Sequence, residues 1–286
     1  MVRSAQALVN DATATPSLPR IYQRLTAALD NPRASTGHIA DVIGDDSGLS
    51  ARLLRLVNSA FYSFPTKVES IAHAVLLVGT EQIRDLALAT SVIRTFKGIS
   101  ADLVDMESFW LHSIATGVTA RILATHRREA NTERFFVAGM LHDVGRLLMY
   151  AKLPGEAAEA LRQARQHGGP LLAAEREVFG FDHSAAGALL LDAWGLPPGL
   201  VEAARCHHAP QEARRHPVDA AVVHVADVIA TALELGSSGD DAVPRLCGPA
   251  WERLGLPASA LDAIAEQTEL QVGDVRGSIL AGVSGA

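Results

Sequence analysis

The chain has 286 residues and a formal net charge of −7, with 48% hydrophobic and 20% charged residues. This composition is typical of a globular protein, and the length is enough for one large or two modest domains with real cores. The acidic balance argues against a clamp for nucleic acid, because such proteins carry basic stripes that neutralise phosphates.

The sequence contains no pattern that would place the protein outside the cytoplasm. Its two cysteines, Cys206 and Cys247, lack C-x-x-C spacing, so neither a disulfide framework nor a zinc ribbon is expected. The N-terminus, MVRSAQALVNDATATPS, lacks the long apolar core of a signal peptide. The most apolar segment, 220–233, is interrupted by His224 and Asp227 and is too short to span a bilayer. We therefore expect a cytoplasmic protein without a membrane segment.

The first half of the chain predicts a series of short helices. Residues 1–16 are small and polar, which predicts a flexible leader. Residues 17–100 show apolar side chains at helical spacing and form the predicted N-terminal helical subdomain. Ser35 or Thr36 could cap one of its helices, and two helical stretches meet near Gly79.

The second half continues with helices after a polar stretch at residues 98–107, where we place a domain boundary. Residues 101–235 predict a helical domain with a metal site, and residues 236–286, which contain Gly, Ser and Pro interruptions, predict a C-terminal helical cap. The chain has no run of alternating polar and apolar residues and no Asn-Gly or Asp-Gly hairpin signal. The expected fold class is therefore all-α.

The stretch at residues 135–150, FFVAGMLHDVGRLLMY, predicts a buried helix that is interrupted by the adjacent pair His142 and Asp143. Burying a charge among apolar side chains costs roughly several kcal/mol unless the charge is paired or binds a metal. Alone, this pair would equally fit a core histidine beside a capping aspartate. Other histidines and aspartates, however, lie in or at the end of further apolar helical segments: His112, His183, His207, His208 and Asp227.

Several helices could thus bring imidazoles and carboxylates together as a divalent metal site. Such a mixed set suits iron, manganese, zinc or similar ions rather than calcium. Two imidazoles and two carboxylates are available for one ion: His112, His142, Asp143 and Asp227. A second set is rich in imidazole: His183, His207 and His208. If Asp143 bridges them, two ions could lie about 3.5–4 Å apart, the spacing used for phosphoryl chemistry, with a shared water as the nucleophile.

Two neighbouring side chains have alternative interpretations. Arg146 follows His142 at i+4, so its guanidinium could bind a phosphate with two hydrogen bonds, or it could be a solvated surface arginine. His224 lies one turn before Asp227 and could orient a ligand, or it could be a core or surface residue. We assign candidate catalytic roles to Asp143 and Arg146. The sequence has no G-x-S-x-G elbow and no Gly-rich loop after a strand, so neither a nucleophilic triad nor a Rossmann or P-loop nucleotide site is expected.

The order of the candidate ligands, H, HD, H, HH and D, resembles that of the HD superfamily of metal-dependent phosphohydrolases, and especially its HD-GYP subgroup. The first half is similar to the HDOD family in two stretches, DDSGLSARLLRLVNSAFYSF and AVLLVGTEQIRDLAL. The later stretch GFDHSAAGALLLDAWGLPPGLVEAARCHHAP is similar to the same family. The resemblance runs roughly from residue 18 to residue 233, and it implies an HDOD-type N-terminal subdomain followed by an HD-type helical bundle.

The resemblance to HDOD proteins implies a bacterial signalling module, of a kind often coupled to receiver or cyclic dinucleotide domains. Many such proteins have lost the metal ligands that this chain keeps. The resemblance implies the same two ligand sets, for two ions. Three positions depart from the related patterns. HAPQEARRHP replaces the Gly-Tyr-Pro stretch after the His pair, which argues against hydrolysis of cyclic di-GMP. Ser108 stands where some HD-GYP proteins offer a glutamate to a third metal, so at most two ions are expected, and Ser47 replaces the proline of the DPxL motif.

Two functions are compatible with this sequence. One is a regulatory module with an HD-type dinuclear metal site. The other is an active phosphohydrolase or phosphodiesterase that acts on a nucleotide-like phosphate ester. A signalling protein or a small phosphate ligand is the expected partner, and neither a nucleic-acid clamp nor a membrane is expected.

Overall fold

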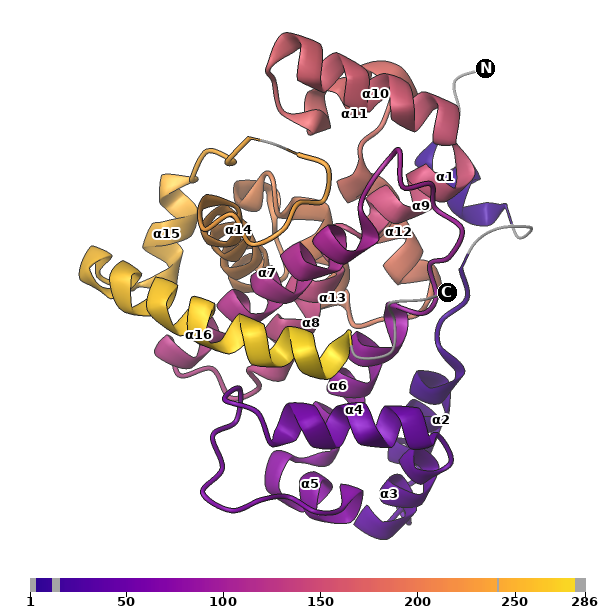
Figure 1. Ribbon diagram of the computed structural model, residues 1–286, viewed down its shortest axis with the longest axis vertical. Helices are drawn as coiled ribbons and strands as arrows, with labels where there is room; N and C mark the ends of the chain where they lie inside the picture. The colour runs from indigo at the N-terminus through magenta and orange to yellow at the C-terminus, as the bar shows by residue number, and fades with distance from the viewer. Residues whose placement is uncertain (1–3, 12–15, 241, 281–286) are drawn as a thin grey trace. The chain divides into compact units, whose positions relative to one another are not determined.

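The computed structural model describes residues 4–11, 16–240 and 242–280, and the chain divides into two compact units (Figure 1). Unit 1 comprises Met1–Ser17 and Phe96–Ala265, and unit 2 comprises Leu18–Thr95 and Glu266–Ala286. Among the described residues none lies in a strand, which confirms the all-α prediction. The division differs from the predicted boundaries, because residues 96–100 belong to unit 1 and the segment 236–286 is divided between the units.

Unit 2 consists of short helices that pack through their apolar faces. Its elements are α2 (Arg20–Leu29), α3 (Thr36–Gly44), α4 (Ser47–Val57), α5 (Ile71–Val78), α6 (Thr80–Val92) and the C-terminal part of α16 (Leu261–Ile279). Helix α6 packs against α2, α4 and α5, and α3 packs against α2, α4 and α5. Ser35 is the N-cap of α3, and its hydroxyl accepts a hydrogen bond from the His38 N–H at 3.2 Å. Gly79, at φ +105°, separates α5 from α6 in a conformation that other residues rarely adopt.

Unit 1 carries the longer helices and all of the candidate ligands. Its elements are α1 (Ala5–Asn10), α7 (Met106–His126), α8 (Glu133–Leu141), α9 (Val144–Lys152), α10 (Pro154–His167), α11 (Leu171–Phe179), α12 (His183–Ala193), α13 (Pro198–Cys206), α14 (Pro217–Ala232), α15 (Gly248–Leu254), and the 3-10 helices η1 (Pro210–Glu212) and η2 (Ala258–Ala260). Helix α7 packs against α8 and α14, and α12 packs against α9 and α13. The candidate ligands therefore lie on helices that contact one another.

The N-terminal segment is not wholly the flexible leader that its composition predicts. Residues 5–10 form α1, which packs against α12 and buries Leu8 and Val9. Lys152 Nζ donates hydrogen bonds to the carbonyl oxygens of Leu8 and Asp11 at 2.8 and 2.6 Å, at the C-terminal end of this helix. The rest of the predicted leader, apart from Ser4, Asp11 and Pro16, lies outside the described residues.

Two close helix contacts in unit 1 depend on glycine. A Cβ on Gly139 of α8 would lie 2.6 Å from the Cα of Gly117 of α7. A Cβ on Gly145 of α9 would lie 2.5 Å from the backbone nitrogen of Gly187 of α12 and would overlap the carbonyl oxygen of His183. Side chains at these positions would push the helix backbones apart. The glycines thus set the spacing of two helix pairs that carry candidate ligands.

No helix in the described ranges is both long enough and apolar enough to span a bilayer. The most apolar segment of the sequence, 220–233, lies in α14 except for its last residue, and the Asp219, His224 and Asp227 side chains of this helix are all buried.

Candidate metal centre

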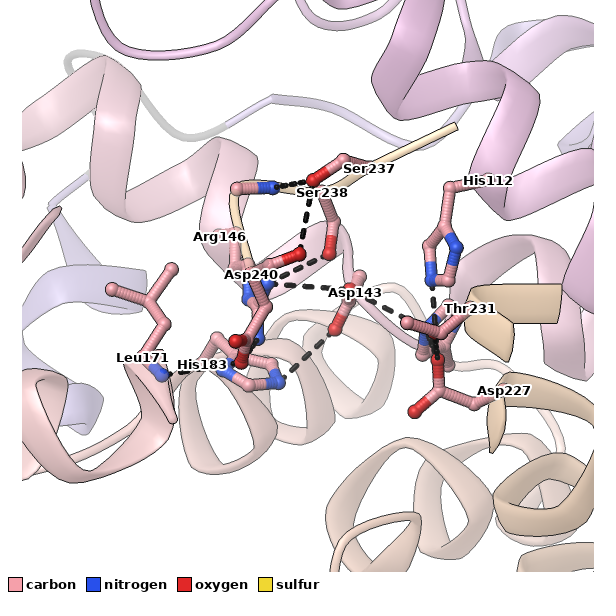
Figure 2. Close-up of polar contacts among 12 residues, drawn as sticks. His112, Asp143, Arg146, Leu171, His183, Asp227, Thr231, Ser237, Ser238 and Asp240 are labelled. Atoms are coloured by element: carbon pink, nitrogen blue, oxygen red, sulfur yellow. Dashed lines mark hydrogen bonds and ion pairs between the residues drawn. The ribbon is translucent and has the colours of Figure 1, made fainter. Parts of the chain in front are cut away.

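The structure brings the predicted ligands together within unit 1. His112 lies in the second turn of α7, and Asp227 lies in α14, which packs against α7. The predicted interruption of the buried helix is a true break, because α8 ends at Leu141, α9 begins at Val144, and His142 and Asp143 occupy the junction. The remaining imidazoles come from the start of α12 and from the turn after α13: His183, His207 and His208. Figure 2 shows His112, Asp143, His183 and Asp227 around one centre.

One group of ligand atoms surrounds Asp143 Oδ1. His183 Nε2 lies 3.0 Å from this oxygen, and His207 Nε2 lies 3.6 Å from it. His183 Nε2 also lies 3.2 Å from His207 Nε2 and 3.0 Å from His208 Nε2. One atom from each of the four side chains therefore lies close enough for a single ion to contact all of them.

A second group lies on the other side of the same carboxylate. His142 Nε2 is 3.4 Å from Asp143 Oδ2 and 3.8 Å from Asp227 Oδ1. His112 Nε2 is 3.2 Å from Asp227 Oδ1. Asp143 thus contributes one oxygen to each group, which is the arrangement expected of a carboxylate that bridges two ions.

Three of the imidazoles are oriented by a hydrogen bond on the side opposite to the centre. His142 Nδ1 lies 2.6 Å from the carbonyl oxygen of Gly139, and His207 Nδ1 lies 2.8 Å from that of Ala204. His183 Nδ1 lies 2.6 Å from a carboxylate oxygen of Glu175. Because these partners are acceptors, each Nδ1 carries the hydrogen, and each Nε2 faces the other ligand atoms.

Both carboxylates are ionised at neutral pH. Burial raises the pKa of Asp143, but the positive charge of Arg146 and of the nearby imidazoles outweighs burial and holds this pKa well below its usual range. Burial likewise raises the pKa of Asp227, whereas the hydrogen bond from His112 and the neighbouring imidazoles lower it below its ordinary value. The centre therefore contains two buried negative charges.

The pKa values of the imidazoles are shifted in opposite directions by this environment. Burial and the nearby guanidinium lower the pKa of His183, but the carboxylates of Glu175 and Asp143 outweigh them and raise it to about 9. Burial lowers the pKa of His207, and burial with two imidazole neighbours holds that of His208 well below its usual value. His183 thus holds a proton near neutral pH at the point where acceptor atoms of the first group converge. A divalent cation bound there would replace this proton.

The donor set fits a divalent metal. Imidazole nitrogen and carboxylate oxygen are ordinary ligands of zinc, iron and manganese, and they are held here by helices and by the residues next to helix ends. His142 Nε2 is buried and makes no well-formed hydrogen bond with the described residues, because its nearest carboxylate oxygen, Asp143 Oδ2, lies 3.4 Å away. A cation held by the second group would bind this nitrogen directly.

Arg146 has different surroundings from those the sequence predicts. Its side chain is 1% exposed, so the alternative of a solvated surface arginine is wrong. The guanidinium lies 3.8 Å from Asp143, 3.5 Å from Glu175 and 3.6 Å from Asp240, and it donates a hydrogen bond to Ser238 Oγ at 2.7 Å. Figure 2 shows it between the candidate ligands and the 236–240 loop. Contact with a phosphate remains a prediction.

The structure adds three residues that sequence reasoning missed: Glu175, Ser238 and Asp240. Glu175 is 2% exposed, and a buried glutamate one helix before a candidate ligand is a signal that burial prediction could have found. Ser238 and Asp240 lie in the segment that the sequence predicts as a C-terminal cap, where nothing local indicates that they contact Arg146.

His224 is a core residue, as one of its interpretations predicts. It is 2% exposed, its Nδ1 donates to the carbonyl oxygen of His207 at 2.7 Å, and its Nε2 accepts from the Cys247 N–H at 2.9 Å. The His224 imidazole therefore contacts the backbone of the candidate ligand His207 and not its ring.

Known proteins share this fold. A protein of unknown function from Geobacter sulfurreducens, which carries an HDOD domain, matches with a TM-score of 0.77 and 24% identity over 96% of this chain and 97% of its own. A candidate phosphohydrolase from Shewanella amazonensis SB2B matches with a TM-score of 0.74 and 25% identity over 96% of this chain and 98% of its own. A candidate signal transduction protein from Marinobacter aquaeolei VT8 matches with a TM-score of 0.72 and 23% identity, over 93% of this chain and 60% of its own.

The sequence comparisons agree with the structural ones. An uncharacterised protein of Treponema pallidum is 25% identical over 202 residues, which is 69% of this chain but 39% of the relative. The chain therefore spans well under half the length of this curated relative. The model of the HDOD domain family matches residues 15–210, which is more than half of the chain. The chain belongs to the HDOD domain family.

Proposed function

We propose that this protein is a bacterial HDOD regulatory module in which an HD-type site holds two divalent metal ions. Its place in the HDOD family and its likeness to a candidate signal transduction protein support the regulatory part of the proposal. We further propose a cytoplasmic location and a signalling protein or a small phosphate ligand as its partner.

The observation that carries the metal proposal is the shared position of Asp143. One of its oxygens lies 3.0 Å from His183 Nε2 and the other lies 3.4 Å from His142 Nε2, so one carboxylate joins both ligand groups. When bound, two divalent ions would supply Lewis acidity and would lower the pKa of a coordinated water. The protein's own contribution is to hold the imidazoles with Nε2 directed inward and to exclude bulk water.

The space beside the centre favours regulation over turnover. A cavity of about 20 Å³ lies between the ligands and the 236–240 loop, and its lining includes His112, Asp143, His208 and Asp227. A cavity needs about 10–15 Å³ to hold one water molecule, so this one has room for a water but not for a phosphate ester. The enclosed space beside the ligands is therefore too small for a nucleotide-like substrate.

An active phosphohydrolase is the second candidate function, and the complete ligand set favours it. The likeness to a candidate phosphohydrolase from Shewanella amazonensis agrees with this alternative. Turnover would require the 236–240 loop to move away from Arg146, which means breaking the hydrogen bond with Ser238 and separating the guanidinium from Asp240.

Metal analysis tests the centre that both candidate functions share. Protein purified without chelator should contain close to two ions of iron, manganese or zinc per chain. Asp143→Ala should lose both, whereas the control Asp192→Ala, at an exposed position of α12, should keep them. Helical circular dichroism would verify folding.

The same preparations should then be supplied with manganese or iron and assayed for hydrolysis of bis(p-nitrophenyl) phosphate and of nucleotide phosphodiesters. Bound metal without hydrolysis supports the regulatory proposal. Hydrolysis that disappears in Asp143→Ala supports the enzyme instead. If the wild-type protein binds no metal, the dinuclear centre and the phosphohydrolase are both refuted, and only the regulatory role supported by the family is left.

A further inference from the structure

Glu175 lies behind one of the candidate ligands rather than among them. Its side chain is 2% exposed and comes from α11, whereas the ligands come from other helices. One carboxylate oxygen, Oε2, accepts the His183 backbone N–H at 2.9 Å and lies 2.6 Å from His183 Nδ1. The same oxygen therefore contacts both the backbone and the ring of His183, which fixes where its Nε2 points.

The location of His183 in its helix explains why a distant side chain is needed. His142 and His207 each follow the end of a helix, where the last carbonyl groups lack helical partners, and each ring donates to the carbonyl oxygen three residues earlier. His183 is the first residue of α12, with Asp182 as the N-cap. At this end of a helix the unpaired groups are N–H donors, so no local carbonyl is available to accept from Nδ1.

Glu175 supplies both an acceptor for the unpaired backbone N–H of His183 and an acceptor for its Nδ1. Gly180, at φ +79°, ends α11 in a left-handed conformation, and α12 begins three residues later at His183, so Glu175 of α11 reaches the first residue of α12. The second oxygen of the carboxylate, Oε1, lies 3.5 Å from Arg146 Nε. Since Arg146 also lies 3.8 Å from Asp143, one guanidinium holds both the carboxylate that orients His183 and the carboxylate that joins the two groups.

Of the candidate ligands in the described part of the chain, Glu175 directly contacts one, His183, on one side of the centre. It touches His183, which belongs to the group of Asp143, His183, His207 and His208. The described contacts of the other group, with His112, His142 and Asp227, do not include it. Loss of Glu175 should therefore disturb one ion position and leave the other.

We infer that Glu175 is a positioning residue that controls the binding of one of the two metal ions, the one held by Asp143, His183, His207 and His208. This inference rests on the proposed dinuclear centre and adds that the two positions depend on different supporting residues. Loss of such a hydrogen-bonded partner of a metal-bound histidine weakens metal binding by about 10- to 100-fold.

The test uses manganese(II) as the probe on the full chain after removal of metal by chelator. Wild-type protein should bind two Mn²⁺ and give the spectrum of a magnetically coupled pair in electron paramagnetic resonance. Glu175→Gln keeps the volume and one acceptor oxygen but removes the charge. It should bind one Mn²⁺ with unchanged affinity and the second about 10- to 100-fold more weakly, and near one equivalent its spectrum should be that of an isolated ion.

Glu177→Gln is the matched control, because Glu177 is exposed and lies two residues further along α11. It should behave as wild type. If Glu175→Gln does not fold, Glu175→Asp keeps the charge but shortens the reach, and it should weaken the same single ion. Two Mn²⁺ bound with wild-type affinity in the Glu175 variant, or equal loss of both, would overturn the inference. A wild-type protein that binds no Mn²⁺ would instead overturn the dinuclear centre itself.

Discussion

Replacing Gly145 with alanine should separate two helices that position the metal ligands. In the structure a Cβ at this position would lie 2.5 Å from Gly187 N and would overlap the carbonyl oxygen of His183. An ordinary contact begins at 3.4 Å, so the backbone of α12 would have to move by about 1 Å to relieve the contact with Gly187 N and by more to relieve that with the His183 carbonyl oxygen. Both contacts are backbone atoms, which cannot rotate away as a flexible side chain can.

The cost should be large for a single methyl group. Overpacking a buried contact costs about 1–3 kcal/mol, and a backbone contact places Gly145→Ala near the upper value. For a chain of this size, about 3 kcal/mol corresponds to a decrease of roughly 6–12 °C in Tm. The displacement also moves His183, at the start of α12, away from Asp143, at the start of α9, so the variant should retain less metal.

Differential scanning calorimetry and metal analysis measure the two effects. Gly155→Ala is the control, because a Cβ at Gly155 of α10 would meet nothing within 4 Å. Alanine has the higher helix propensity, so this control should be neutral or slightly more stable than wild type. The reasoning fails if Gly145→Ala melts at the same temperature as Gly155→Ala and retains the same amount of metal.

Three further predictions follow from particular contacts. His112→Ala and His208→Ala should each remove one ion and leave the other, because they belong to different ligand groups; loss of both ions from either variant, measured by mass spectrometry of metals, would contradict this. Ser238→Ala should lower the free energy of unfolding by about 1–3 kcal/mol in urea, because the buried guanidinium of Arg146 loses a hydrogen-bond acceptor; an unchanged midpoint would show that another group replaces the hydroxyl. Burial raises the pKa of Glu202, but three backbone N–H groups that donate to its carboxylate outweigh burial and lower this pKa, so the carboxylate stabilises the fold above about pH 4.5 and loses this effect as the pH falls further. Glu202→Gln should therefore lower the free energy of unfolding by about 1 kcal/mol at pH 7 and by progressively less in acid. A decrease that does not depend on pH would refute the assignment.

The sequence alone determined the helices and the identities of the candidate ligands. Helix propensity, capping and apolar spacing act over a few residues, so Ser35 could be recognised as one of two possible caps for α3. The pair His142 and Asp143 could be recognised because adjacent polar residues contradict an otherwise apolar helix. Periodicity could not show which atoms His183 contacts at the start of α12.

Only the tertiary structure decided which residues contact and orient these candidate ligands. Arg146 and Ser238 are 92 positions apart, and their hydrogen bond depends on the path of the chain after α14. The burial of Arg146, the contact of Asp240 with it and the contact of Glu175 with His183 all join different elements. Even the division of the chain into units depends on its C-terminal segment, which local composition predicts as a single cap. Such contacts are determined by the packing of whole helices, which leaves no periodic signal in the residues themselves.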